Sequence, residues 1–114
     1  MAFEAELADR IRDLLAGDAD VTEKRMFGGL AFLVAGNLAI AASGQGGLLV
    51  RVDPVESDQL VAGSNAHPAV MRGRPMKGWL RVDTPDVRTS RQLSTWVNLG
   101  ATFAHSLPSK RAGD

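Results

Sequence analysis

The chain of 114 residues contains no cysteine. It can therefore form neither disulfide bonds nor thiolate metal sites, which is typical of proteins in a reducing compartment. It also lacks any apolar run near the roughly 20 residues that a helix needs to cross a membrane, because the longest, residues 30–35, has the length of a strand. Residues 1–6 have neither the basic nor the apolar segment of a signal peptide. We therefore expect a cytoplasmic protein that does not bind a membrane.

Histidine is scarce as well, since His67 and His105 are the only two. A hydrolytic metal site needs several histidines or carboxylates that converge, and neither histidine has ligand spacing around it. We interpret His67 as a loop residue and His105 as a surface residue in the last turn of a helix, where the helix dipole favours a cation. We expect no metal and no cofactor.

The glycine-rich segment 43–47 lacks the features of a catalytic or nucleotide-binding motif. It has no lysine for a phosphate-binding loop, and Leu49 stands where a dinucleotide fingerprint needs its third glycine. Ser43, Asp53 and a histidine would form a triad only by chance, because no nucleophile motif accompanies them. We assign no catalytic residues and interpret segment 43–47 as a flexible loop.

The net charge is zero, but the charges are distributed unevenly. Residues 1–23 contain seven acidic residues and two arginines, whereas residues 72–91 contain six basic residues and two aspartates. A protein that coats nucleic acid normally has a basic domain overall, so we expect weak or absent nucleic-acid binding. Two solvated surfaces of opposite charge are the favoured explanation of the pattern, and a local basic face is the alternative.

Apolar periodicity, turn residues and capping signals divide the chain into helices and strands. Apolar residues at helical spacing predict a first helix that ends near Gly17. Pro54 at a first helical position predicts a second helix, and the Thr89–Gln92 capping box predicts a third. Strands are predicted at residues 21–27, 29–35, 38–42, 48–52, 69–72 and 78–82. The Gly36-Asn37 pair between two apolar runs indicates a β-hairpin.

The order of these elements predicts the fold class. We interpret residues 21–27 as a first strand that ends at the Gly28-Gly29 break, and we give the order of the elements as helix, three strands, helix, two strands, helix. Short loops between successive strands favour antiparallel pairing. We therefore predict an α+β domain over residues 1–108, with a five-stranded antiparallel sheet, three helices and a polar tail at 109–114. The predicted core consists of Leu7, Ile11, Leu14, Phe27, Phe32, Val34, Ile40, Leu49, Val50, Leu80, Trp96 and Phe103.

The predicted strands within 30–35 and 38–42 are apolar at nearly every position. An antiparallel sheet with one face in water should alternate apolar and polar residues, so both faces of this sheet require cover. Three helices of modest length leave one face bare unless they divide between the two faces, and a bare apolar patch is unusual on a soluble monomer. We therefore predict a homodimer through the sheet, with helices on both faces as the alternative.

One cluster of basic and aromatic residues is the candidate binding surface. It consists of Arg72, Arg74, Lys77 and Trp79. Guanidinium and ammonium groups beside an aromatic ring can hold a phosphate, a carboxylate or a stacked base. We consider a partner-binding role for this cluster. The alternative role is structural, with Trp79 at the edge of the core and the arginine stems lying over it.

Several glycine-punctuated motifs follow one another along the chain. They are Lys24-Arg25-Met26-Phe27-Gly28-Gly29-Leu30-Ala31-Phe32, then Gly36-Asn37, then Leu49-Val50-Arg51-Val52, then Gly73-Arg74-Pro75-Met76-Lys77-Gly78-Trp79. In order and spacing they resemble the N-terminal domain of the TfoX/Sxy family over nearly the whole chain. The resemblance implies a secretion-chaperone-like α+β fold with the element order given above, and it implies no catalytic residues.

The resemblance also implies a function. Full-length TfoX/Sxy relatives regulate natural competence, act with the cyclic-AMP receptor protein at promoters and carry a second, helical C-terminal domain. We therefore predict a non-enzymatic regulatory or protein-interaction module whose partner the sequence does not identify. The alternative is a small-molecule or phosphoryl-handling enzyme that uses the region of Arg51, Arg74 and Lys77. A deep pocket with converging polar groups in that region would favour the alternative.

Overall fold

The computed structural model describes residues 4–26 and 28–110. Three α-helices, six strands and one short 3-10 helix follow one another along these residues. Their bounds are α1 (Ala5–Leu14), β1 (Val21–Met26), β2 (Gly29–Val34), β3 (Asn37–Ala42), β4 (Leu48–Arg51), α2 (Ser57–Ala62), β5 (His67–Met71), β6 (Arg74–Val82), η1 (Thr84–Val87) and α3 (Ser90–Ser106). The α+β class, the three helices and the antiparallel pairing of the strands are confirmed.

The strands form one sheet in the order β1-β2-β3-β4-β6-β5. The prediction of five strands is wrong, because β1 belongs to the sheet and pairs with the whole of β2. The central side chains of β1 are exposed, so the strand has no apolar pattern to mark it as part of a core, and an edge strand needs none. The guanidinium of Arg12 in α1 donates hydrogen bonds of 2.6 and 2.8 Å to the Glu23 carboxylate, which connects β1 to the helix.

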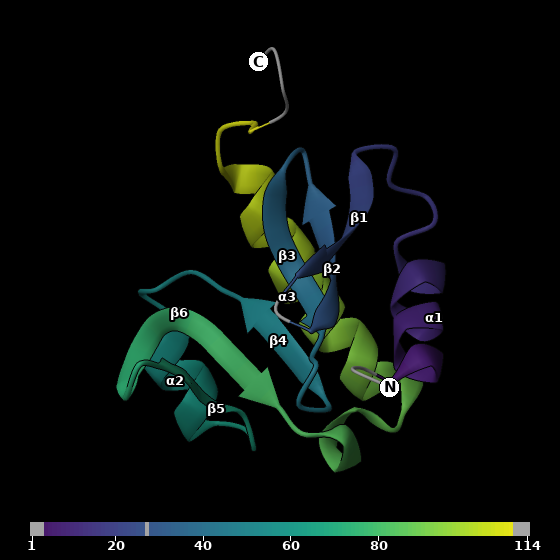
Figure 1. Ribbon diagram of the computed structural model, residues 1–114. Helices are drawn as coiled ribbons and strands as arrows, with labels where there is room; N and C mark the ends of the chain where they lie inside the picture. The colour runs from purple at the N-terminus through teal and green to yellow at the C-terminus, as the bar shows by residue number, and fades with distance from the viewer. Residues whose placement is uncertain (1–3, 27, 111–114) are drawn as a thin grey trace.

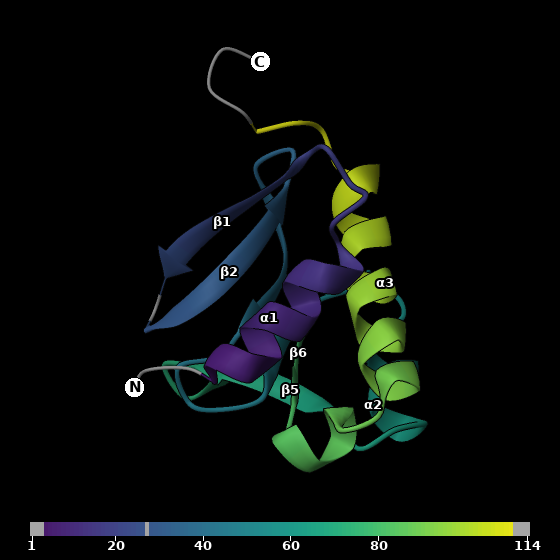
Figure 2. The same cartoon turned by 90° about the vertical axis from the view of Figure 1, so that its right-hand side faces the viewer.

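The main hydrophobic core lies between one face of the sheet and the three helices. The fully buried Phe32 and Ile40 of the sheet belong to the same cluster as Ile11 of α1 and Leu93 of α3, and Leu60 of α2 packs against this cluster. Figure 1 shows α3 behind β2 and β3, and Figure 2 shows α1 and α3 on the same side of β1 and β2. Within the described part of the chain, no helix has the length and apolar character to span a membrane.

Most of the predicted core is confirmed. The confirmed residues are Leu7, Ile11, Phe32, Val34, Ile40, Val50, Leu80 and Trp96, all of which are buried. The prediction that Leu14 belongs to the core is wrong. Its exposed fraction is 44%, because α1 ends there and Leu15 is buried in the core instead. Leu49 and Phe103 are only partly buried, since Leu49 faces away from the helices and Phe103 packs beside Arg51 at the flank of α3. Phe27 lies outside the described residues.

The predicted start of the third helix is confirmed, and the predicted start of the second helix is not. The capping box is present. The backbone amide of Gln92 donates to Thr89 Oγ1 at 3.1 Å, and the backbone amide of Thr89 donates to Gln92 Oε1 at 3.0 Å. The predicted start of the second helix at Pro54 is wrong, because α2 begins at Ser57. The Val55 amide donates instead to Asp53 Oδ1 at 3.0 Å, and this local turn delays the helix.

Glycine and its neighbours shape the two hairpins. The β2–β3 hairpin is confirmed, with Ala35 and Gly36 as the turn residues at φ values of 50° and 85°. Positive φ at both central residues is typical of a tight hairpin turn. β6 is longer than predicted because Gly78, at φ 88°, lets the strand continue through an irregular position. β5 is also longer, since it begins at His67, which was predicted to lie in a loop.

The close approach of α3 to the sheet depends on Gly100. A Cβ atom at this position would lie 2.4 Å from the carbonyl oxygen of Ala39 in β3. We expect Gly100→Ala to lower the free energy of unfolding by about 2 kcal/mol. Displacement of the packed helix should outweigh the roughly 1 kcal/mol that alanine gains over glycine within a helix. Urea denaturation followed by circular dichroism measures the effect.

Gly17→Ala is the control for this substitution, because nothing lies within 4 Å of a Cβ atom placed there. Its free energy of unfolding should stay close to that of the unsubstituted protein. A Gly100→Ala protein that is as stable as the unsubstituted chain would contradict the tight packing of α3.

Candidate interaction surface

Side chains on the second face of the sheet form an apolar cluster of their own. Ala31, Leu38 and Ala41 are buried at its centre. Around them lie the partly buried side chains of four further residues, namely Met26, Leu33, Leu49 and Trp79. We call these seven residues the open face, because none of the described helix residues contributes to the cluster.

Alternation along the strands places these residues together. In β2, Phe32 faces the helices, so its neighbours Ala31 and Leu33 face the opposite side. In β4, Val50 faces the helices and Leu49 does not. β2 and β3 are apolar on both faces, and the three helices all pack into the cluster on one face. Helices on both faces, the alternative that the sequence allowed, are not found in the described structure.

Arg51 of β4 lies among the residues of the open face. It stands directly opposite Trp79 in the β4–β6 pairing, and cross-strand partners share a face of the sheet. The centre of its guanidinium lies 5.1 Å from the centroid of the Trp79 ring system and 5.5 Å from that of Phe103 in α3. Attraction between a cation and aromatic rings at these distances holds the guanidinium in place.

Two further cations flank the apolar residues. Lys24 stands opposite Ala31 in the β1–β2 pairing, and Arg81 stands opposite Leu49 in the β4–β6 pairing. Arg12, Lys77 and the two histidines form ion pairs with carboxylates, whereas Lys24, Arg51 and Arg81 have no carboxylate partner among the described residues. These three cations lie on the same face as the seven apolar residues, and we include them in the open face, which is thus both apolar and positively charged.

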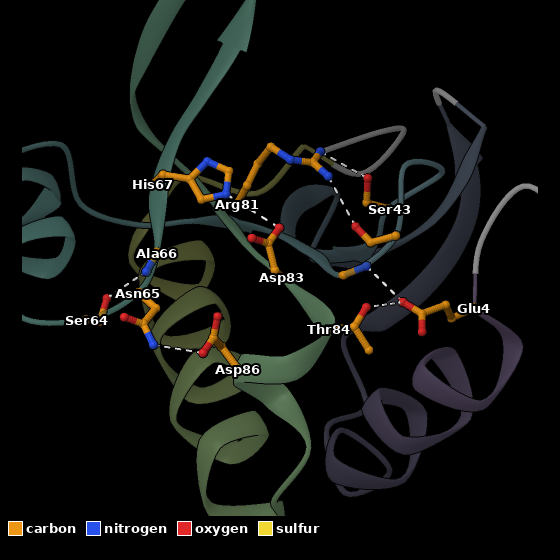
Figure 3. A network of polar contacts seen from close by, with 12 residues as sticks. Glu4, Ser43, Ser64, Asn65, Ala66, His67, Arg81, Asp83, Thr84 and Asp86 are labelled. Carbon is orange, nitrogen blue, oxygen red and sulfur yellow. Dashed lines mark hydrogen bonds and ion pairs between the residues drawn. The ribbon is translucent and has the colours of Figure 1, made fainter.

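Hydrogen bonds position Arg81 against the loop between β3 and β4 (Figure 3). Its Nη1 donates to Ser43 Oγ at 3.1 Å, and its Nη2 donates to the carbonyl oxygen of Gly46 at 3.1 Å. Segment 43–47, which was predicted to be a flexible loop, is thus tied to β6.

The Glu4 carboxylate holds the same loop from the other side (Figure 3). It accepts hydrogen bonds from the Gly47 amide at 2.9 Å and from the Thr84 hydroxyl at 2.6 Å. These bonds lower the pKa of Glu4 below its ordinary value, and the Gly47 amide makes the larger contribution. The start of α1, the β3–β4 loop and η1 are therefore connected through one carboxylate.

The two histidines each lie beside one aspartate. His67 Nε2 is 3.5 Å from Asp83 Oδ1, and His105 Nε2 is 2.6 Å from Asp18 Oδ2. The hydrogen bond with His105 lowers the pKa of the Asp18 carboxyl group. Throughout residues 4–26 and 28–110, no three His, Cys, Asp or Glu side chains gather in a way that could hold a metal ion.

The predicted partner-binding residues do not form one cluster. Arg72 and Arg74 are exposed at the β5–β6 turn, where Arg72 adopts a φ of 54°. Lys77 Nζ lies 3.9 Å from Asp58 Oδ2 of α2, and Trp79 alone belongs to the open face. A partner-binding role for Arg72, Arg74 and Lys77 stays a prediction.

The other residues of the open face were not identified as a surface from the sequence. Their signal was present, because β2 and β3 lack the polar alternation of a half-solvated sheet. The sequence does not give the register between the strands. That register places Lys24 opposite Ala31 and Arg51 opposite Trp79.

A groove with a volume of 590 Å³ lies between α3 and the segment that leads into α2. It is lined by Asp53 and Glu56 on one side and by residues of α3 on the other. Arg51, Arg74 and Lys77, which the small-molecule alternative requires, are not among its lining residues. The convergence that would favour this alternative is therefore not found around the groove.

These features define a class of structure: a small α+β domain whose helices cover one face of an antiparallel sheet and leave the other apolar and basic. The family model of the TfoX N-terminal domain matches residues 13–104. The chain therefore belongs to the TfoX N-terminal domain family, as the order of its glycine motifs indicates. No curated protein and no solved structure matches it.

Glu4→Gln tests the connection between α1 and the β3–β4 loop. A neutral amide accepts weaker hydrogen bonds than a carboxylate, and the partial exposure of Glu4 limits the loss. We expect the free energy of unfolding at neutral pH to fall by about 1 kcal/mol. Urea denaturation measures it, and Glu6→Gln is the control because Glu6 is exposed on the same helix.

The pH dependence of this effect has a definite sign. The pKa of Glu4 is lower in the folded protein than its ordinary value of 4.5, so the stabilisation is complete above that value and is lost as the pH falls through the folded value. The stability difference between the unsubstituted protein and Glu4→Gln should therefore shrink on acidification below about pH 4.5. A difference that stays constant through this range would contradict the role of the carboxylate.

Proposed function

We propose that this chain is a non-enzymatic regulatory module of the TfoX N-terminal type that acts by binding a protein partner through the open face. The observation that carries the proposal is the open face, where Met26, Leu33, Leu49 and Trp79 keep part of their surface exposed around three buried residues and no described helix residue covers them. Contiguous apolar surfaces that a soluble protein leaves without cover mark interaction sites. Membership of the TfoX N-terminal domain family supports the regulatory role.

The residue types of the open face match those of an interface core. Tryptophan, methionine and arginine are enriched where two proteins meet, and tryptophan and arginine often carry much of the binding energy. Trp79 and Arg51 lie together on β6 and β4, Met26 lies on β1, and Leu33 and Leu49 lie on strands between these edges of the cluster. A partner would thus meet a central apolar area with an aromatic anchor at one side.

We propose that the module takes part in transcription regulation in the cytoplasm, through a protein contact rather than through direct DNA binding. The net charge of zero supports a protein contact, because nucleic-acid-binding domains are normally basic overall. The homodimer stays a prediction, and the open face is the surface that it would use.

Removal of apolar side chains from the open face tests the proposed contact. We expect Leu33→Ser combined with Leu49→Ser to reduce partner capture about tenfold, because interface side chains in the centre of a contact carry most of its energy. Affinity purification from native lysate with quantitative mass spectrometry measures the capture, and thermal unfolding verifies the fold.

Val55→Ser is the matched control, since Val55 is 85% exposed and lies outside the open face. It should retain the captured partner. Equal capture by all three proteins would remove the open face as the contact surface. A reproducible metabolite hit in a thermal-shift screen, with no protein partner, would favour the small-molecule alternative.

Direct DNA binding should be weak, non-specific and sensitive to salt, because any such binding would rest on a few surface cations. Fluorescence anisotropy with labelled duplexes at physiological salt measures it. Submicromolar, sequence-selective binding under these conditions would contradict the proposed mode of action.

A further inference from the structure

The open face combines apolar side chains with cations that have no carboxylate partner in the described structure. Lys24 is exposed on β1, while Arg51 and Arg81 are partly buried on β4 and β6. The cations therefore stand on both sides of the apolar centre formed by Ala31 and Ala41. Any molecule that binds over this centre also removes water from around these three cations.

The chemistry of the cations restricts the occupant. A charge that is removed from water without a partner is strongly unfavourable, whereas a carboxylate beside an arginine forms charge-assisted hydrogen bonds. Arg51 lies over the Trp79 ring, and a stacked guanidinium presents its N–H groups at its edge, where a carboxylate can accept two of them. A wholly apolar occupant would leave the cations unpaired, and a basic occupant would be repelled.

We infer that the partner element which occupies the open face is an apolar stretch of polypeptide flanked by aspartate or glutamate side chains that pair with Lys24, Arg51 and Arg81; this inference rests on the proposed function. The apolar side chains of the stretch cover the exposed parts of Leu33, Leu49 and Trp79. The carboxylates supply the counter-charges that the open face lacks.

A second copy of this chain is the competing occupant. In a twofold dimer the same patch of both copies meets, so the cations of both copies would approach one another with no acid of the open face between them. This like-charge arrangement favours an acidic partner over a dimer that joins the two open faces.

Selection from a phage-displayed library of random short peptides on the immobilised chain tests the inference. We expect the selected peptides to be enriched in aspartate and glutamate beside leucine, isoleucine or aromatic residues. One selected peptide is then synthesised and its affinity is measured by fluorescence anisotropy. Its affinity should fall with increasing salt, because exposed charge pairs are screened.

Substitutions locate the binding. Lys24→Glu reverses an exposed charge on the open face and should weaken the peptide about fivefold to tenfold. Arg91→Glu makes the same change at an exposed position of α3, outside the open face, and should leave the affinity unchanged. Leu49→Ser removes an apolar contact and should also weaken binding, which provides a second test that does not alter charge.

Several results would overturn the inference, and they differ from those that would overturn the proposed function. Selected peptides without acidic enrichment, or binding that neither Lys24→Glu nor Leu49→Ser weakens, would refute the acidic occupant while a protein partner elsewhere remained. A dimer by light scattering that Leu49→Ser dissociates would make a second copy the occupant. Binding of phosphatidylserine vesicles or duplex DNA that Lys24→Glu abolishes, with no peptide selected, would also refute it. Failure of the peptide selection together with the absence of any partner from lysate would refute the proposed function as well.

Discussion

The packing of α3 against β3 is the contact on which the rest of the structure depends. Gly100 has no side chain, so the backbone of α3 can approach the carbonyl oxygen of Ala39, and Val97 and Ala104 are buried on either side. α1 lies on the same side of the sheet and adds Ile11 to the core that α3 forms with β2, β3 and β4. α2 packs at the border of this cluster through Leu60 and Val61. All three helices are therefore used on one face.

This one-sided packing determines what the central strands present to solvent. β2 and β3 are apolar on both faces, and the face that the helices do not reach is turned toward the viewer in Figure 1. Small side chains, Ala31 and Ala41, occupy its middle, and larger ones such as Leu33 and Trp79 stand around them. The largest fully buried side chains, such as Phe32 and Ile40, lie on the core face, whereas Leu33, Leu49 and Trp79 on the open face are only partly buried.

Positive charge accompanies this apolar surface, because Lys24, Arg51 and Arg81 lie on the same face of the sheet. Elsewhere on the molecule, Arg12 of α1 lies beside Asp9 and Glu23, and Nζ of Lys77 in β6 lies 3.9 Å from Oδ2 of Asp58. On the open face, the guanidinium of Arg51 lies instead beside aromatic rings. No carboxylate of the described residues forms an ion pair with Arg51.

Local signals were sufficient for the parts of the fold that depend on neighbouring residues. The capping box at Thr89, the reversal near Gly36 and the buried positions of β2 could all be predicted, because each depends on sequence spacing of a few residues. Residues 21–27 were predicted as a strand, but the sheet was predicted with five strands. The exposed side chains of β1 give no apolar signal for its pairing with β2, which makes the sheet six-stranded.

The candidate site was harder to predict because it depends on tertiary packing. Trp79 was identified as a surface aromatic, but its proximity to Arg51 rather than to Arg72 and Arg74 follows from the register of β4 with β6. Which face of the sheet the helices cover is likewise decided by the packing of distant segments. Because the central strands are apolar on both faces, their local sequence pattern does not indicate which face the helices cover.

Exposure of the open face in solution is measured most directly by NMR, through the relaxation that a soluble gadolinium chelate causes at methyl groups of the free protein. The methyl groups of Leu33 and Leu49 should relax clearly faster than those of Ile40 and Leu80, which are fully buried in the core. Val70, which is 63% exposed, provides the upper reference. Methyl groups of Leu33 and Leu49 as protected as that of Ile40 would show that the face is covered and would contradict its role as a free contact surface.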